Sequence, residues 1–439
     1  MIFGIDLGTT NSLVGIGDDL LTGLVSSNVN VATKSQVKRD VVGEDIVSSY
    51  KTDMSVSPDG QLSIQCSAIV LKELARLGTR RYGSEVKDVV ISVPAYFSTS
   101  QREAVYKATE IANLNVKALI NEPTAAALYL CKNVKDLIVV YDLGGGTFDV
   151  SIVDSRTGVY SVIATDGIVL GGDDLDMAIV QDAIDQCKIP IRYRSKINLK
   201  HLKSKMRLAK EEIQKTKSNV FVELSDFGVK SDYVLTPEKY KEIIYEVFGK
   251  TISMTEAIIS RNIPLCEVPK VVFVGGSSSC PFLKEILKNE IELEEVASDI
   301  NPDLIVAKGV SIYAEMLNNG KAETYVEDVT KRLCIEDENG RGITIIDSNS
   351  IIPCRNSITV SNSVTGDTLS LKLYQGDSIV AKNNDYIGTL VYNYGREVEK
   401  NDGIVEVTVE VSTDGVITLH ANEVLFGDGL AQAIQLTSR

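Results

Sequence analysis

Two short turns carry aspartate, glycine and threonine residues in an arrangement that suits phosphate and metal binding. The first begins at Asp6 and reads Asp-Leu-Gly-Thr-Thr-Asn, and the second begins at Asp142 and reads Asp-Leu-Gly-Gly-Gly-Thr. Each lies between two apolar runs typical of strands, so its backbone N–H groups can approach phosphate oxygens while the aspartate orders a hydrated Mg²⁺. One such turn indicates little, because hairpins use glycine for conformational reasons. Two matching turns predict a phosphate clamp.

Two further glycine pairs are candidates for the rest of a nucleotide site. Gly275-Gly276 ends an apolar run and leads into an expected helix, so its backbone can lie flat against a nucleoside. Gly171-Gly172 is placed to cover the phosphates from the other lobe. For either pair alone, a tight turn is an equally good interpretation. No G-x-x-x-x-G-K-[ST] occurs, and Asp149 stands where G-x-G-x-x-G would end, which excludes P-loop and Rossmann sites.

The elements that position these turns fall into two groups. Residues 1–320 alternate β-branched runs with helical patterns, which predicts an α/β nucleotide-binding domain. Residues 332–439 alternate polar and apolar side chains with period two, which predicts a β-sandwich. Residues 321–331 have the polar composition of a linker.

Three local predictions follow within the α/β part. We expect a strand over 88–93 and then a helix opened by a capping box of Ser100 and Glu103. The many lysines and glutamates of 196–217 predict a largely solvated helix pair that projects from the main body.

Composition excludes several classes of partner. The chain has 439 residues and a formal charge of −15, so no basic field attracts nucleic acid or a membrane surface. No apolar run approaches the roughly 20 residues that a membrane helix needs. No signal peptide is visible before the first strand, and the seven cysteines form no C-x-x-C pair. We therefore expect a cytoplasmic protein with reduced thiols.

Four strings, in this order, resemble the seventy-kilodalton heat-shock chaperones of the DnaK type, within the actin-like ATPase superfamily. They are IDLGTTNS at 5–12, VVISVPAYFS followed by QR within 89–102, INEPTAAA at 120–127 and DLGGGTFDVS at 142–151. Later strings such as VVFVGGSSSCP and LYQGDSIVAKNN extend the resemblance almost end to end. It implies a two-lobed α/β ATPase domain with the actin-like (ribonuclease H-like) fold, followed by an all-β sandwich.

The resemblance also implies roles for individual residues. Catalysis would involve Asp6, Lys51, Glu122, Asp142 and Thr147, with Lys51 positioning the attacking water. A solvated surface lysine is the alternative for Lys51. Asp6, Asp142 and Glu122 would hold Mg²⁺ mainly through water, and potassium is a further expected ion. The residues expected around ATP or ADP are Gly8, Thr9, Thr10, Asn11, Gly144, Gly145, Gly146, Thr147, Gly171, Gly172, Lys210, Gly275, Gly276, Ser277 and Ser279.

The sandwich is expected to take an extended, unfolded peptide by main-chain hydrogen bonds and an apolar pocket. Leu369 and Leu371 match the pocket, with Ile343 and Ile345 on the neighbouring strand. Ordinary sandwich core is the alternative for these four residues.

Other positions bear on communication between the parts. Pro94 and Arg102 match a proline and an arginine that relay nucleotide state to the interdomain face. The family's partners are a J-domain cochaperone and a nucleotide-exchange factor, and a monomer is expected. Where family members often have an arginine that meets the J-domain, this chain has Ala118.

The sequence departs from the family pattern around the adenine and at its end. Ser279 stands where an arginine usually lies against adenine. The helix that closes over the adenosine offers Arg207, Lys210, Glu211 and Gln214 in place of Glu, Lys, Arg and Ser. These changes predict a lower nucleotide affinity. The chain ends just after the sandwich, so the helical lid is expected to be absent.

Three functions are compatible with these observations. We favour an ATP-dependent chaperone in which slow hydrolysis to ADP and phosphate changes the affinity for exposed apolar segments. The first alternative is a nucleotide-responsive cochaperone or exchange partner that binds ATP with little hydrolysis. The second is a small-molecule kinase or filament ATPase of the same superfamily, against which the sandwich argues.

Overall fold

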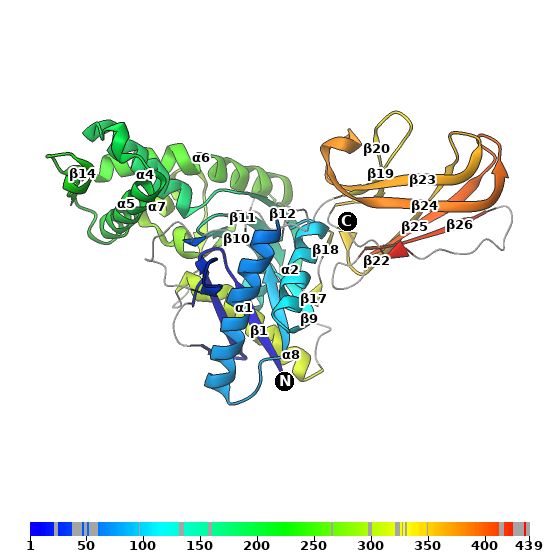
Figure 1. Cartoon of the computed structure of the whole chain (residues 1–439), viewed down its shortest axis with the longest axis horizontal. Coiled ribbons are helices and arrows are strands. Elements are labelled where there is room, and N and C mark those ends of the chain that lie inside the picture. Colours follow the sequence, from blue (N-terminus) through cyan, green and yellow to red (C-terminus); the bar gives the residue numbers. More distant parts are fainter. Residues whose placement is uncertain are drawn as a thin grey trace.

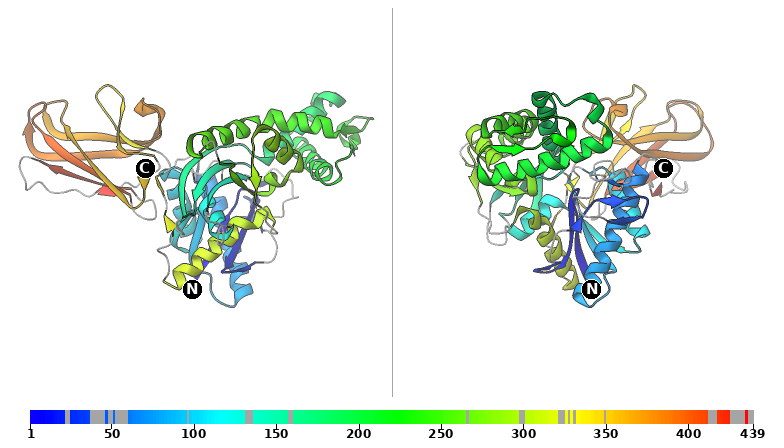
Figure 2. Two further views of the ribbon diagram at one scale, coloured as in Figure 1. Left: turned by 180° about the vertical axis from the view of Figure 1, so that it is seen from behind. Right: turned by 60° about the vertical axis from the view of Figure 1, so that its left-hand side comes forward.

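The computed structural model describes residues 1–439 apart from 22–24, 37–45, 48–50, 52–59, 96, 131–135, 157–159, 265–266, 297–300, 321–324, 327, 330–331, 349, 412–416, 425–433 and 436–439. Figure 1 shows an α/β body with a helical region at one end, drawn in green, and an all-β part beside its opposite end, drawn in yellow to red. The view from behind in Figure 2 has the same arrangement.

The first half of the α/β body is built on a six-stranded sheet. Its strands are β1 (Ile2–Leu7), β2 (Asn11–Ile16), β3 (Asp19–Leu20), β4 (Val25–Ser26), β8 (Asp88–Val93) and β9 (Asn115–Asn121). The strands β1 and β2 form an antiparallel hairpin, and β1 runs parallel to β8, which runs parallel to β9. The predicted strand over 88–93 is therefore confirmed.

Two helices cover this sheet because their apolar faces share a core with it. They are α1 (Gln61–Tyr82) and α2 (Thr99–Ile111). A small three-stranded sheet of β5 (Val29–Asn30), β6 (Ser35–Gln36) and β7 (Ile46–Val47) lies near α1. The capping box predicted at Ser100 was wrong. Ser98 caps α2 instead, because Gln101 can replace glutamate and Ser98 has the extended backbone that a cap needs.

The second half repeats the arrangement of the first. Its six strands are β10 (Leu137–Leu143), β11 (Phe148–Asp154), β12 (Tyr160–Ile168), β15 (Lys270–Val274), β16 (Glu294–Glu295) and β17 (Tyr325–Val326). The strands β10 and β11 form an antiparallel hairpin, and β10 runs parallel to β15. Each half therefore places one Asp-Leu-Gly turn at the tip of a hairpin that is flanked by a parallel strand.

The two sheets meet through two helices, α3 (Glu122–Leu130) and α8 (Ile305–Asn318). These helices pack on each other and share one core with residues of both sheets, such as Val90 of β8 and Val140 of β10. Gly309 of α8 permits the close approach, because a Cβ there would lie 1.7 Å from the carbonyl oxygen of Ala125. The helix pair thus fixes the distance between the two turns.

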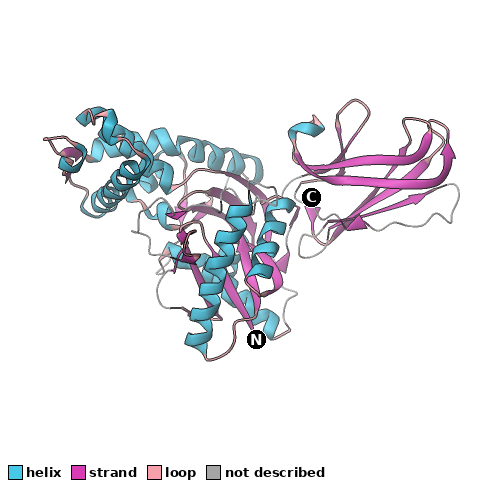
Figure 3. Cartoon of the chain, viewed as in Figure 1, coloured by secondary structure: helices cyan, strands magenta, loops and turns pink. Residues whose placement is uncertain are grey.

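The helical region stands on the second sheet, as Figure 3 shows in cyan. It contains α4 (Gly172–Cys187), η3 (Ile191–Tyr193), α5 (Lys196–Thr216), η4 (Ser225–Phe227), α6 (Pro237–Asn262), α7 (Pro281–Glu290) and a hairpin of β13 (Val220–Val222) and β14 (Tyr233–Leu235). The helix pair predicted over 196–217 is one continuous helix. Its apolar stripe, Leu202, Met206, Ala209 and Ile213, has helical spacing with no breaker, so the chain has no reason to turn.

The all-β part consists mainly of two four-stranded sheets, β20-β19-β23-β24 and β22-β25-β26-β27. Their strands are β19 (Leu333–Glu336), β20 (Gly342–Ile346), β22 (Cys354–Ser361), β23 (Gly366–Gln375), β24 (Asp385–Val398), β25 (Ile404–Val411), β26 (Ile417–Glu423) and β27 (Ile434–Gln435), with η8 at Ala381–Asn383. Inward residues of both sheets form one core.

Two very short strands occupy the predicted linker. The first, β17, pairs with β12 of the second α/β sheet. The second, β18 (Asp328–Val329), pairs with β21 (Ser350–Ile351) in the all-β part. Among the helices that the structure describes, none is both long and apolar enough to cross a membrane.

We expect Gly309→Ala to lower the free energy of unfolding of the ATPase part by about 1–3 kcal/mol, because the added methyl group overpacks the contact between α3 and α8. Gly249→Ala is the matched control. It lies in α6, where a Cβ would meet no atom within 4 Å, so alanine should stabilise the helix by up to about 1 kcal/mol. Urea unfolding measures both, and an equal effect of the two substitutions would contradict the packing described.

Candidate nucleotide-binding site

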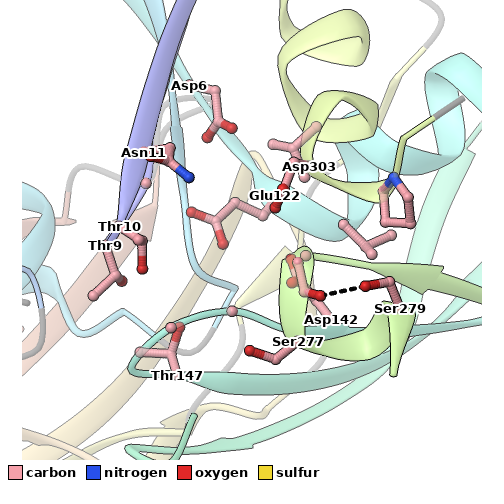
Figure 4. Close-up of a pocket in the computed structure, with 18 of the residues that line it drawn as sticks. Asp6, Thr9, Thr10, Asn11, Glu122, Asp142, Thr147, Ser277, Ser279 and Asp303 are labelled. Carbon is pink, nitrogen blue, oxygen red and sulfur yellow. Dashed lines mark hydrogen bonds between the residues drawn. The ribbon is translucent and has the colours of Figure 1, made fainter. Parts of the chain in front are cut away.

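A cavity of about 270 Å³ lies between the two sheets and receives both Asp-Leu-Gly turns. Of the residues predicted for nucleotide and metal, it is lined by Asp6, Gly8, Thr9, Thr10, Asn11, Lys51, Glu122, Asp142, Gly144, Gly145, Thr147, Lys210, Gly275, Gly276, Ser277 and Ser279. Figure 4 shows Thr9 and Thr10 on one side of the pocket and Ser277 and Ser279 on the other. Gly146, Gly171 and Gly172 do not line it.

The first turn is braced by Ser27, the residue directly after β4. Ser27 donates its hydroxyl to the carbonyl oxygen of Gly8 at 2.7 Å, and its backbone N–H donates to the carbonyl oxygen of Thr10 at 2.8 Å. A Cβ at Gly8 would lie 2.1 Å from the carbonyl oxygen of Asn11, so only glycine fits this fold of the backbone. The turn is therefore a fixed cradle with Thr9 and Thr10 at the cavity.

The second turn is held by Gly171 and Gly172, which do not themselves line the cavity. The N–H of Gly172 donates to the carbonyl oxygen of Gly144 at 3.0 Å. A Cβ at Gly171 would lie 2.5 Å from the backbone of Gly145. Gly171 and Gly172 thus support the turn at the start of α4, a role that sequence alone did not distinguish from direct contact.

The two turns approach each other closely. A Cβ at Gly145 would lie 1.9 Å from the hydroxyl oxygen of Thr10. The two turns can therefore approach this closely because residue 145 has no side chain. Two glycine turns that present N–H groups and threonine hydroxyls to one space form a cradle for a chain of phosphates.

Carboxylates crowd the centre of the site around one ammonium group. Lys51 is 4% exposed and donates from Nζ to Glu122 Oε1 at 2.7 Å. Lys51 is therefore a buried, paired lysine, and the alternative of a solvated surface lysine is wrong. Asp6 accepts a hydrogen bond of 2.7 Å from the Ser92 hydroxyl, and Asp142 lies on the same cavity.

This crowding raises the pKa of the aspartates. Burial, followed by the charge of Glu122, raises the pKa of Asp6 to about 6. Burial, Glu122 and Asp6 raise the pKa of Asp142 well above its ordinary value. Ionised carboxylates in this position are costly without a cation, so the residues fit a divalent ion. No three His, Cys, Asp or Glu side chains of the described residues converge on one point as direct ligands.

Sequence reasoning missed two acidic residues. Asp303 lines the cavity from η6 (Pro302–Leu304), and no role was predicted for this residue from the sequence. Asp149 ends the second motif, and within the described residues both of its buried carboxylate oxygens lack a hydrogen-bond donor. Burial and then Glu122 raise the pKa of Asp149 well above its ordinary value. Its position two strand residues beyond Thr147 was a signal that could have found it.

The far end of the cavity is formed by α5 and η5 (Gly276–Ser279). Lys210 is tied to Asp176 by an ion pair of 2.6 Å and donates to the carbonyl oxygen of Gly172 at 3.4 Å. Gly275 adopts a φ of +78°, and a Cβ there would lie 2.6 Å from the carbonyl oxygen of Leu143. The absence of a side chain at Gly275 therefore allows η5 to pack against the start of the second turn.

The two predicted relay residues lie outside the cavity. Arg102 Nη2 donates to Asn121 Oδ1 at 2.6 Å, and Asn121 directly precedes Glu122. Pro94 directly follows β8, and its carbonyl oxygen accepts a hydrogen bond from the N–H of Phe97 at 3.1 Å. Arg102 thus links α2 to the junction that positions Glu122.

The predicted peptide residues divide into two groups. Ile345, Leu369 and Leu371 are buried in the core of the all-β part, which is the alternative that the sequence left open. Ile343 is 44% exposed on β20. A peptide role for these residues stays a prediction.

Two repeated hairpin sheets that face one cavity, with a glycine turn from each, define a two-halved nucleotide-binding ATPase. The family model described as Hsp70 protein matches residues 33–439, and the chain belongs to the Hsp70 family. The resemblance found in the sequence is thereby confirmed. Membership gives the chain the family's actin-like ATPase fold, a chaperone-type ATP-binding function and the use of ATP or ADP with Mg²⁺.

We expect Gly145→Ala to weaken ATP binding by about tenfold to a hundredfold, the equivalent of 1–3 kcal/mol of overpacking between the two turns. Titration calorimetry with Mg²⁺ and ATP measures the change, and circular dichroism checks the fold. Gly249→Ala serves as the control and should bind like the parent. Unchanged affinity in Gly145→Ala would show that the contact between the turns does not shape the phosphate site.

Proposed function

We propose that this protein is an ATP-dependent chaperone whose slow ATP hydrolysis modulates its affinity for exposed apolar segments of unfolded polypeptides. The observation that carries the proposal is the buried Lys51–Glu122 pair, which faces Asp6 and Asp142 in a cavity closed by two phosphate turns. A purely structural cavity would have no use for three carboxylates around one lysine, because such a cluster opposes folding.

Each group in the cleft has a proposed task. The two turns, from Gly8 to Asn11 and from Gly144 to Thr147, bind the β- and γ-phosphates. Asp6, Asp142 and Glu122 hold Mg²⁺ through water, and the bound ion supplies neutralisation of phosphate charge. Glu122 accepts a hydrogen bond from one of the three N–H groups of the Lys51 ammonium. The two remaining N–H groups orient the attacking water against the γ-phosphate. Asp149 supports a further cation, for which potassium is the proposal.

Coupling between the two parts is proposed to run through the short strands β17 and β18. They belong to different parts of the molecule and are one residue apart in the chain, which supports a mechanical link. Arg102 supplies the second half of the route, because it contacts Asn121 beside Glu122. We place the peptide on the sheet that carries Ile343, in a cytoplasmic monomer served by a J-domain cochaperone and an exchange factor.

A second candidate function is a nucleotide-responsive cochaperone or exchange partner that binds ATP with little hydrolysis. It is favoured by the altered nucleoside end of the cavity, where Glu211 and Ser279 stand. Hydrolysis kinetics separate the two candidates.

We expect Lys51→Ala to lower the single-turnover rate of ATP hydrolysis by about a hundredfold to a thousandfold, as is usual when one preorganised donor at the reacting phosphate is lost. Rapid mixing with radiolabelled ATP measures the rate. Lys72→Ala, which removes an exposed lysine of α1, is the matched control and should hydrolyse like the parent.

Peptide affinity completes the test. A labelled apolar peptide should bind the parent more weakly with ATP than with ADP, and Lys51→Ala should stay in the weak-binding state after ATP is added. No turnover by either protein would favour the second candidate. Equal rates in the parent and in Lys51→Ala would refute the role of Lys51.

A further inference from the structure

The nucleoside end of the cavity contains a carboxylate that forms no ion pair with any residue that the structure describes. Glu211 and Gln214 lie one turn apart on α5, and both line the cavity. Within the described residues, the side chain of Glu211 makes neither a hydrogen bond nor an ion pair. Its half-buried side chain is therefore a charged acceptor that faces the space beyond the phosphate turns.

The two lysines of the cavity lining are committed to other carboxylates. Lys210 pairs with Asp176 at 2.6 Å, and Lys51 pairs with Glu122 at 2.7 Å. Neither one offsets the charge of Glu211. A ligand that carries hydrogen-bond donors would complement the Glu211 carboxylate.

The neighbours of Glu211 at this end also present acceptors. Gln214 donates one amide N–H to the hydroxyl of Tyr240 at 2.6 Å, which fixes the amide and leaves its carbonyl oxygen as an acceptor beside one remaining N–H. Ser279 donates its hydroxyl to the carbonyl oxygen of Gly276 at 2.6 Å, so its oxygen has only lone pairs left. This end of the cavity is thus rich in acceptors.

Such an end discriminates between the two purines. Guanine carries neighbouring donors, the N1–H and the N2 amino group, which match the two oxygens of one carboxylate. Adenine has an acceptor at N1 and only the N6 amino group as a donor, so a carboxylate would face a lone pair.

We infer that this site binds guanine nucleotides at least as tightly as adenine nucleotides, with Glu211 as the residue that determines the preference. The inference rests on the proposed function only in that the two turns hold the phosphates. It assigns to the site a nucleotide class beyond ATP and ADP, and Glu211 acts by accepting hydrogen bonds from the base.

Titration calorimetry of the full chain with Mg²⁺ and ADP, GDP or IDP tests the inference. IDP keeps the N1–H of guanine but lacks the N2 amino group. GDP should bind at least as tightly as ADP, and IDP should bind about tenfold more weakly than GDP, because one charge-assisted hydrogen bond is lost. Glu211→Gln should lower the ratio of GDP affinity to ADP affinity by about tenfold.

Glu212→Gln is the matched control, because Glu212 is the exposed neighbour on the same helix, and it should leave the ratio unchanged. GDP binding that is measurably weaker than ADP binding in the parent would overturn the inference and leave the proposed function intact. An equal loss of ADP and GDP affinity in Glu211→Gln would also overturn it, since Glu211 would then hold the ribose. If no nucleotide binds at all, the proposed function itself fails.

Discussion

The excess of buried negative charge between the two sheets is the constraint on which the rest of the structure depends. Asp6, Glu122 and Asp142 line one cavity, where Lys51 pairs with Glu122 and the other lysine among the described lining residues, Lys210, pairs with Asp176. Burial of like charges disfavours folding, and the raised pKa values of Asp6 and Asp142 show that the cost is present. The cluster is therefore best explained by the ligand, a phosphate chain with its cation, which offsets that cost when it binds.

The fold holds this cluster together from both sides. The helices α3 and α8 pack between the sheets at a distance that Gly309 makes possible, and Glu122 begins α3 at the centre of the site. In each half, a hairpin and one parallel strand are then sufficient to position the Asp-Leu-Gly turn at the cavity. Thr10 of the first turn lies close to Gly145 of the second turn. A movement of one half therefore changes the geometry of the phosphate site.

Much of this could be predicted from the sequence, because the decisive signals are local. The paired Asp-Leu-Gly turns, the strand over 88–93 and the change to period two after the linker all follow from short patterns. The start of α2 was misplaced because two serines satisfy the same capping pattern and only backbone geometry selects Ser98. The single helix α5 was missed because charge dominated the interpretation of 196–217 over its continuous apolar stripe.

Long-range packing accounts for what the sequence did not give. The burial of Lys51 against Glu122 joins residues 71 positions apart, so no local pattern reports it. Asp303 enters the site from η6, which is distant in the sequence from both turns. Likewise, strand alternation predicts that Leu369 and Leu371 share a face, and only the packed sheets show that this face is the core.

A crystal structure with Mg²⁺ and a non-hydrolysable ATP analogue tests the central claim most directly. We expect the phosphates between the two Asp-Leu-Gly turns and the cation held through water by Asp6 and Asp142. We expect Lys51 Nζ within about 3 Å of a γ-phosphate oxygen or of the attacking water. Phosphates bound outside the turns, or a cation away from both aspartates, would contradict this claim.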